Sequence, residues 1–197
     1  MAEKVKLETG VVTLAFPYLF EKDEDGKYRC AIFFPKSDKA NATKIASAIK
    51  QAKKNLFGEE KIEDFKSPLI DGNKKDLEKY PFFKDCYIMN ASSTFDITVL
   101  DPKGNTLTAD RADDIYTGCK CRLMVSLGAY THTKTKTKGV KAYLPAVMVG
   151  GGKRLIEKPT ISFSSSEGLE DLSNNKEAAM ESTFCNADEL DDLLSQV

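Results

Sequence analysis

The chain has 197 residues, 41% of them hydrophobic, and its 29 basic and 30 acidic residues give a net charge of −1. A chain of this length and composition is most simply one globular domain with appendages. It has no apolar run of the roughly 20 residues needed to cross a bilayer and no secretory signal at its start, so we expect a cytoplasmic protein with no membrane partner.

The charges are distributed unevenly along the chain. Residues 167–197 contain nine acidic residues and one basic residue, a net charge of −8, so the first 166 residues carry +7. A basic body favours binding to a polyanion, and an acidic tail either competes for the same surface or recruits another protein. A solvated terminus without a role is the simpler alternative. We expect a binding domain over residues 1–163 and a flexible acidic tail over residues 164–197.

Cysteine and histidine are too scattered to indicate a metal site. The five cysteines are at positions 30, 86, 119, 121 and 185, and His132 is the only histidine. A structural zinc site needs about four such ligands that converge on one point. We therefore expect reduced cysteines that pack as small apolar groups, and neither a metal nor a cofactor.

Hydrophobic alternation and turn residues predict several short strands. A strand over residues 5–20 is bent at Gly10, and the Asp25-Gly26 pair after it is a strong hairpin signal. Further strands are predicted over residues 28–35, 86–93 and 95–100, with a helical turn over 110–115.

One helix is predicted over residues 39–57, where apolar residues recur at intervals of three and four. Ser37 or Asp38 can cap its start, and Gly58 is a natural stop. The following stretch, residues 59–81, is long enough to be a folded excursion rather than a simple connection.

Two long strands joined by a basic hairpin are predicted over residues 118–130 and 140–149. In the first strand, cysteine, leucine and valine alternate with Lys120, Arg122 and Tyr130, which gives a core face and a second face. The hairpin THTKTKTKG is expected to hold its basic residues on one side: His132, Lys134, Lys136 and Lys138. The return strand is expected to place Val140, Ala142, Leu144, Ala146 and Met148 opposite Lys141, Tyr143, Pro145 and Val147.

Six stretches of the chain, in this order, resemble a family of bacteriophage single-stranded-DNA-binding proteins. They are TGVVTLAFPYLFE, YRCAIFFPKSD, PLIDGN, YPFFKDCYIMNASS, GCKCRLMVSLGAY and KGVKAYL, and they span most of residues 5–163. The resemblance implies a mainly β oligonucleotide-binding (OB) fold, a five-stranded, partly open barrel with an inserted helix. To this fold the sequence patterns add the long basic hairpin and a disordered acidic tail. The resemblance also implies sequence-nonspecific binding of single strands in phage DNA replication, recombination or repair, in the host cytoplasm.

Single-strand binders combine cations that follow the phosphates with aromatic rings that stack on bases. The candidates for phosphate contact are Lys120, Arg122, Lys134, Lys136, Lys138 and Lys141. The candidates for stacking are Tyr130 and Tyr143, followed by Tyr87 and Tyr116, although each tyrosine could equally pack half-buried on the sheet.

The acidic tail ends in a short amphipathic stretch that suits docking to a replication or recombination protein. Its candidate contact residues are Asp188, Glu189, Leu190, Asp191, Asp192, Leu193 and Leu194. The sequence leaves open whether the protein forms a homo-oligomer such as a dimer.

Three other functions compete with this interpretation. No nucleophile with a positioned base and no metal cluster emerges, so an enzyme is not expected. A scaffolding protein of a virion would leave the separation of charge unexplained. An RNA-binding OB protein is not distinguished by sequence, because stacking surfaces accept both nucleic acids.

Deleting residues 167–197 should tighten the binding of single-stranded DNA, because a net charge of −8 leaves the vicinity of the basic body. A filter-binding titration of the full chain and the shortened chain at low salt measures this effect. Weaker binding after the deletion would contradict competition by the tail.

Overall fold

The computed structural model describes residues 3–157, which form a mainly β domain with a single eight-stranded sheet. Five strands build a barrel: β2 (Val12–Tyr18), β3 (Tyr28–Pro35), β5 (Cys86–Ser93), β7 (Cys119–Thr131) and β8 (Lys138–Gly152). Three short strands extend the sheet: β1 (Val5–Glu8), β4 (Leu69–Asp71) and β6 (Thr98–Leu100). The predicted acidic tail and its boundary at residue 163 lie outside the described residues.

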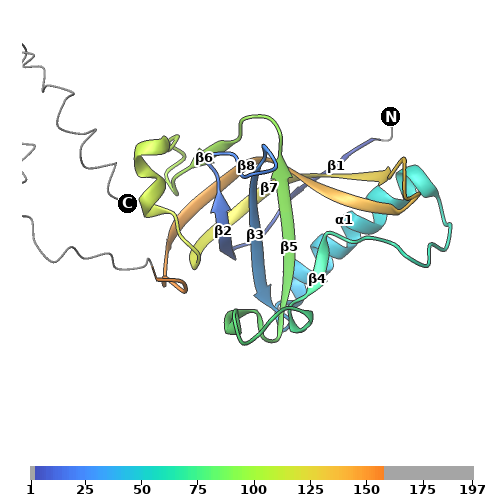
Figure 1. Cartoon of the computed structure of the whole chain (residues 1–197), viewed down its shortest axis with the longest axis horizontal. Helices are drawn as coiled ribbons and strands as arrows, with labels where there is room; N and C mark the ends of the chain where they lie inside the picture. Colours follow the sequence, from blue (N-terminus) through green and yellow to red (C-terminus); the bar gives the residue numbers. More distant parts are fainter. Residues whose placement is uncertain (1–2, 158–197) are drawn as a thin grey trace, which may run out of the picture. The chain divides into compact units, whose positions relative to one another are not determined.

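The ring of strand pairs is complete, whereas we expected a partly open barrel. The order is β7-β2-β3-β5-β8, and β8 pairs antiparallel with β7 from Thr131↔Lys138 to Cys119↔Gly152. β8 meets β5 in parallel through only two residue pairs, Ala91↔Ala142 and Ser92↔Tyr143. The barrel is therefore closed by one long ladder and one narrow seam (Figure 1).

The predicted bend at Gly10 divides the first strand into β1 and β2. The Gly10 N–H donates to Asn41 Oδ1 at 2.8 Å, and a Cβ at this glycine would lie 2.7 Å from the same oxygen. The two halves then pair with different parts of β7, at Leu7↔Val125 and Val12↔Cys121. The bend lets one chain segment turn a barrel corner.

The helix α1 (Lys39–Phe57) has the predicted bounds and packs against β1, β7 and β8 (Figure 1). Asp38 is the N-cap, and its carboxylate accepts from the Asn41 N–H at 3.1 Å. The helix buries Ile45, Ile49 and Ala52 against the barrel, and Gly58 ends it with φ +60°. Among the described residues, no helix is both long and apolar enough to cross a membrane.

Strand alternation gives the barrel an inner core and a second, outer core. Leu14, Ile32, Met89, Leu123 and Leu144 are fully or almost fully buried inside, and each contributes about 1.5–3 kcal/mol of hydrophobic stabilisation. On the outer face, the chain after β4 folds back through two short 3₁₀ helices, η1 (Gly72–Lys74) and η2 (Pro81–Phe83). The outer core holds Ala15, Ala31, Phe33, Phe83, Cys86 and Ile88. Within residues 3–157, this excursion covers one end of the outer face and leaves the other end uncovered.

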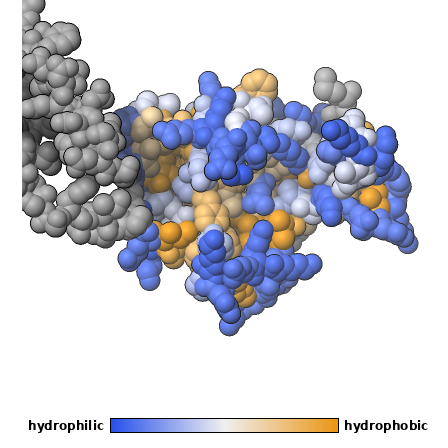
Figure 2. All heavy atoms as spheres, viewed as in Figure 1, coloured by the Kyte–Doolittle hydropathy of each residue, from blue (hydrophilic) through white to orange (hydrophobic). Residues whose placement is uncertain are grey.

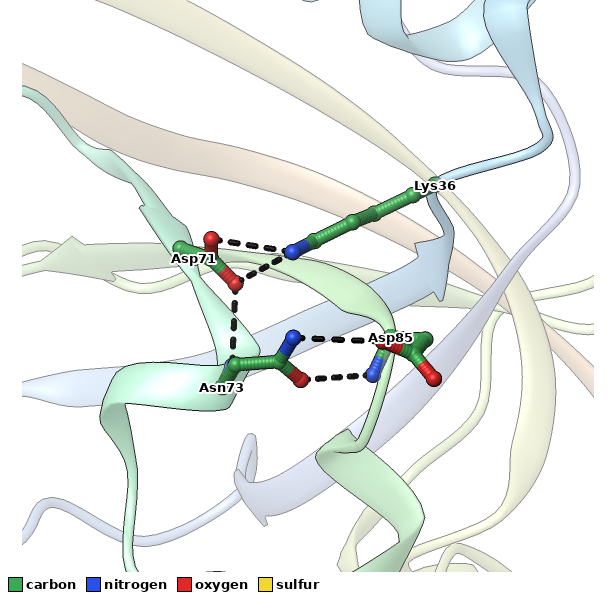
Figure 3. Close-up of polar contacts among 4 residues, drawn as sticks. All are labelled: Lys36, Asp71, Asn73 and Asp85. Carbon is green, nitrogen blue, oxygen red and sulfur yellow. Dashed lines mark hydrogen bonds and ion pairs between the residues drawn. The ribbon is translucent and has the colours of Figure 1, made fainter.

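A polar network fastens this excursion to the end of β3 (Figure 3). Lys36 Nζ lies 2.8 and 2.9 Å from the two carboxylate oxygens of Asp71, and Lys36 holds the pKa of this carboxyl below its ordinary value. Asp71 accepts from the Asn73 N–H at 3.0 Å. Asn73 and Asp85 exchange two hydrogen bonds of 2.8 and 3.1 Å.

In the second half of β8, the side chains point to the opposite sides of the sheet from those we predicted. Val147 and Val149 are buried, whereas Ala146 and Met148 are only partly buried. The ladder shifts register opposite β7, from Met124↔Ala146 to Ser126↔Tyr143. A bulge at this point adds one residue to β8 and reverses the side-chain phase, and Pro145, which lacks an N–H, fits such a position.

The predicted row of lysines along the hairpin is also wrong. Residues 132–137 form a compact loop rather than extended strands. The Lys136 N–H donates to the His132 carbonyl at 2.9 Å, and the His132 N–H donates to the Thr137 carbonyl at 2.8 Å. Lys136 adopts φ +56°, so the chain reverses within the loop and the alternation expected from TKTKTK is lost.

A helix-cap variant, Asp38→Ala, should lower the free energy of unfolding by about 1 kcal/mol at neutral pH. Hydrogen bonds from Asn41 lower the pKa of the Asp38 carboxyl from its ordinary value of 3.8. The ionised cap therefore stabilises the folded state fully above pH 3.8, and this stabilisation is lost as the pH falls through the lower pKa of the folded state. The cost of the substitution should therefore shrink in acid, as measured by urea unfolding. Asp38→Asn is the uncharged control, and an equal cost for Asp38→Ala at all pH values would contradict the charge effect.

Candidate nucleic-acid interface

The outer face of β3 and β5 carries a groove of about 640 Å³. Its floor includes small side chains, Ala31 of β3 and Asn90 and Ser92 of β5. The loop between β2 and β3 forms one wall, and residues 66–68 with the base of the β7–β8 hairpin form the other. β3 and β5 are the second and third barrel strands, the face on which OB folds bind oligonucleotides. Figure 2 shows apolar surface in the middle of the view, with hydrophilic side chains gathered above and below it.

A bulge in β2 directs aromatic side chains toward this groove. The pairing of β2 with β3 shifts register, Phe16 adopts φ +48°, and its N–H donates to Thr117 Oγ1 at 3.0 Å. Bulges re-aim the side chains that flank them. Phe16 lies edge-on to Tyr80, with 5.1 Å between ring centroids, and both line the groove together with Tyr18 and Tyr130.

Four cations come together in the groove from separate parts of the chain: Lys27, Arg29, Lys66 and Lys141. Burial and then repulsion from Lys27 lower the pKa of Lys141 from its ordinary 10.5. Asp23 and Asp25 also line the groove but pair with Arg29, and within residues 3–157 the three lysines have no ion-pair partner. An anionic ligand is favoured there, because a phosphate would relieve the repulsion between the lysines. Arg29 differs from the lysines, because its Nε lies 2.7 Å from Asp23 Oδ2.

The second wall is attached to the hairpin by backbone hydrogen bonds. The Lys66 N–H donates to the Lys138 carbonyl at 3.0 Å, and the Val140 N–H donates to the Lys66 carbonyl at 2.9 Å. Between them, a Cβ at Gly139 would lie 2.6 Å from the Lys66 oxygen. Lys138 Nζ lies 2.6 and 2.8 Å from the Glu60 carboxylate oxygens. Glycine at 139 therefore permits the contact that places Lys66 at the groove.

Two of the residues predicted from the sequence, Tyr130 and Lys141, line this groove. Tyr143 lies beside it, because the Lys141 ammonium is 5.3 Å from the Tyr143 ring centroid. The Lys4 ammonium covers the same ring at 4.2 Å. These three predicted residues therefore belong to one region of the surface.

The structure does not bring the remaining candidates into the groove. On β7, Lys120 donates to Thr13 Oγ1 at 2.9 Å, and Arg122 lies 3.6 Å from Glu8. Lys134 and Lys136 are in the hairpin loop, and Lys138 pairs with Glu60.

Two tyrosine candidates also have partners elsewhere. Tyr87 packs against Phe34, with 5.9 Å between ring centroids, and lies near the Lys36 ammonium at 5.8 Å. The Tyr116 hydroxyl donates to the Gly152 carbonyl at 2.8 Å. The single cationic and aromatic face expected along β7 and β8 is thus divided between several regions.

Sequence reasoning missed most of the groove, and one signal could have found part of it. Lys27 and Arg29 lie at the start of a strand that is apolar on both faces. Charged side chains are rare in such a buried strand unless they have a specific role, so these two cations could have been singled out. No comparable signal marks Lys66 or Tyr80, because the predicted excursion over residues 59–81 has no periodicity that fixes its position. Phe16 and Tyr18 depend on a bulge that the sequence does not reveal.

The cysteines within the described residues behave as packed apolar groups. Cys30, Cys86, Cys119 and Cys121 are free and buried, and burial raises the pKa of Cys30 to about 12. Across residues 3–157, no three His, Cys, Asp or Glu side chains are grouped in a way that could hold a metal ion.

Comparison with known proteins agrees with the barrel fold. The family model described as the single-stranded-DNA-binding protein of Enterobacter phage Enc34 matches residues 4–161. The chain belongs to this family. No curated protein sequence matches the chain significantly.

Solved structures of phage proteins share the fold of this family member. The single-stranded DNA-binding protein from bacteriophage Enc34 has 20% identity and a TM-score of 0.66, with 86% of this chain and 89% of that chain covered. The same phage protein in complex with single-stranded DNA has 22% identity, a TM-score of 0.63 and coverage of 76% and 88%. The protein gp2.5 of bacteriophage T7 has 16% identity, a TM-score of 0.50 and coverage of 78% and 98%.

Removing the ion pair in Glu60→Gln/Lys138→Gln should leave the salt dependence of DNA binding unchanged, because the pair carries no net charge. Removing the loop cations in Lys134→Gln/Lys136→Gln should flatten the slope of log affinity against log salt by about 1.4, if both contact phosphates. Titrations of an oligo-dT at several salt concentrations compare the two variants. A flatter slope for the ion-pair variant would show that Lys138 itself contacts phosphate.

Proposed function

We propose that the protein binds single-stranded DNA without sequence preference in the groove over β3 and β5. The carrying observation is that one groove on this face combines partly exposed aromatic rings with three lysines that have no ion-pair partner among the described residues. Lys27, Lys66 and Lys141 are the phosphate contacts, and Tyr18 and Tyr130 are stacking groups. Such a combination binds the backbone by charge and the bases by their faces, which every base presents.

The groove favours a single strand over a duplex. Its lining combines small side chains, aromatic rings and cations, so unpaired bases can reach the rings while the phosphates meet the lysines. In a duplex the base faces are stacked on one another and unavailable. Family membership, with a model described as a phage single-stranded-DNA-binding protein, supports the same ligand.

The proposed biological setting is phage DNA replication, recombination or repair in the host cytoplasm, where single strands are exposed. In this role the protein acts by binding rather than by catalysis. The acidic tail is the proposed contact for replication or recombination proteins, and the hairpin loop with Lys134 and Lys136 is proposed to reach additional phosphates.

A gel shift with oligo-dT, duplex DNA and single-stranded RNA tests the ligand class. Binding should be strongest for oligo-dT and should weaken with salt by about 0.7 log units of affinity per log unit of salt for each phosphate contacted. Equal binding of duplex DNA would contradict the proposal, and stronger binding of RNA would favour an RNA-binding function instead.

The variant Lys66→Gln/Lys141→Gln tests the groove itself and should flatten the salt slope by about 1.4, because two phosphate contacts are lost. The matched control is Lys44→Gln/Lys50→Gln, which removes two exposed lysines from α1, outside the groove lining. Equal slopes for the groove variant and the α1 control would place the DNA elsewhere on the protein.

A further inference from the structure

One wall of the groove contains a buried carboxylate that a phosphate-binding surface would not need. The side chain of Asp23 is 1% exposed, although it lies among the cations that line the groove. Its Oδ1 accepts from the Asp25 N–H at 2.9 Å and from the Lys27 N–H at 3.0 Å. These two hydrogen bonds fix the turn between β2 and β3 and fix the orientation of the carboxylate.

The other carboxylate oxygen of Asp23 holds Arg29. The Arg29 Nε lies 2.7 Å from Asp23 Oδ2, in an ion pair whose arginine side chain is 49% exposed. A second carboxylate, that of Asp25, lies 3.9 Å from the Arg29 Nη1. The positive charge of Arg29 is therefore already balanced before any ligand arrives, whereas Lys66 and Lys141 have no ion-pair partner within residues 3–157.

The same ion pair orients the guanidinium against an aromatic ring. The central carbon of the Arg29 guanidinium lies 5.4 Å from the centroid of the Tyr18 ring, and Tyr18 is 45% exposed. A guanidinium held by an ion pair near an aromatic ring presents a flat surface. Flat guanidinium and aromatic surfaces are the ones on which unpaired bases stack.

We propose that Arg29 and Tyr18 form a stacking platform for a base of the single strand, and that Asp23 is the positioning residue that holds Arg29 in place. Arg29 then contributes contact with a base, whereas Lys66 and Lys141 contribute contact with phosphates. This inference rests on the proposed function and assigns separate tasks to two kinds of cation in one groove.

The decisive comparison uses two oligonucleotides of equal length, oligo-dT and an analogue with abasic residues, which keeps the phosphates and lacks the bases. In the full-length protein, Arg29→Lys keeps the positive charge opposite Asp23 but removes the planar group. It should weaken binding of oligo-dT at least about fivefold, the lower end of what one stacked base contributes. It should not change binding of the abasic analogue or the salt slope.

Two further variants separate positioning from phosphate contact. Asp23→Asn keeps an oxygen that can accept from the Asp25 and Lys27 N–H groups but frees the charge of Arg29. It should weaken oligo-dT binding relative to the abasic analogue and steepen the salt slope by about 0.7. Lys66→Gln, the phosphate control, should weaken binding of both oligonucleotides equally and flatten the slope by about 0.7.

The outcomes separate this inference from the proposed function. If Arg29→Lys weakens the binding of both oligonucleotides equally, or leaves the binding of oligo-dT unchanged, the stacking platform is refuted, whereas the proposal of DNA binding stands. If the wild-type protein retains neither oligonucleotide at low salt, the proposed function itself fails. Thermal unfolding of each variant identifies any loss of binding that comes from a loss of fold.

Discussion

The antiparallel ladder between β7 and β8 is the interaction on which the rest of the structure depends. It runs from Thr131↔Lys138 at the hairpin to Cys119↔Gly152 at the far end, while the opposite closure between β5 and β8 has only two residue pairs. β1, β2 and β6 all add to this hairpin, on one side or the other. The other strands therefore attach to the two strands of this ladder: β1 and β2 pair with β7, and β5 and β6 pair with β8.

The groove exists because the excursion between α1 and β5 covers only part of the outer face. Its aromatic residues pack over Phe33 and Ile88 and build a second core, and its first part follows the base of the hairpin through Lys66. The uncovered part lies between them and retains the floor of small side chains. The same chain segment thus stabilises one half of the face and forms a wall for the other half.

Local sequence signals predicted the elements well, because these elements are set by short-range chemistry. The bounds of α1, β3 and β5 follow from periodicity and from Asp38 and Gly58, and the bend at Gly10 follows from its missing side chain. The facing of β8 beyond Pro145 was wrong because a bulge changes phase by one residue. The lysine row was wrong because hydrogen bonds within a loop of six residues outweighed the strand preference of threonine.

The site was harder to predict than the fold, because its residues meet only in three dimensions. Tyr130 and Lys141, which line the groove, lie on the regular strands β7 and β8, whose alternation is visible in the sequence. Lys66 and Tyr80 come from a stretch without periodicity, and their position depends on contacts with residues more than fifty positions away, such as Gly139. The family resemblance was correct because it depends on ordered sequence stretches rather than on the facing of any single residue.

The close packing of Lys66 on Gly139 has a consequence for the dimensions of the groove. Because main-chain atoms of two segments meet there with no room for a β-carbon, the wall at residue 66 cannot slide along or away from the hairpin base without breaking both backbone hydrogen bonds that join them. The width of the groove on this side is therefore set by backbone hydrogen bonds rather than by side-chain conformation.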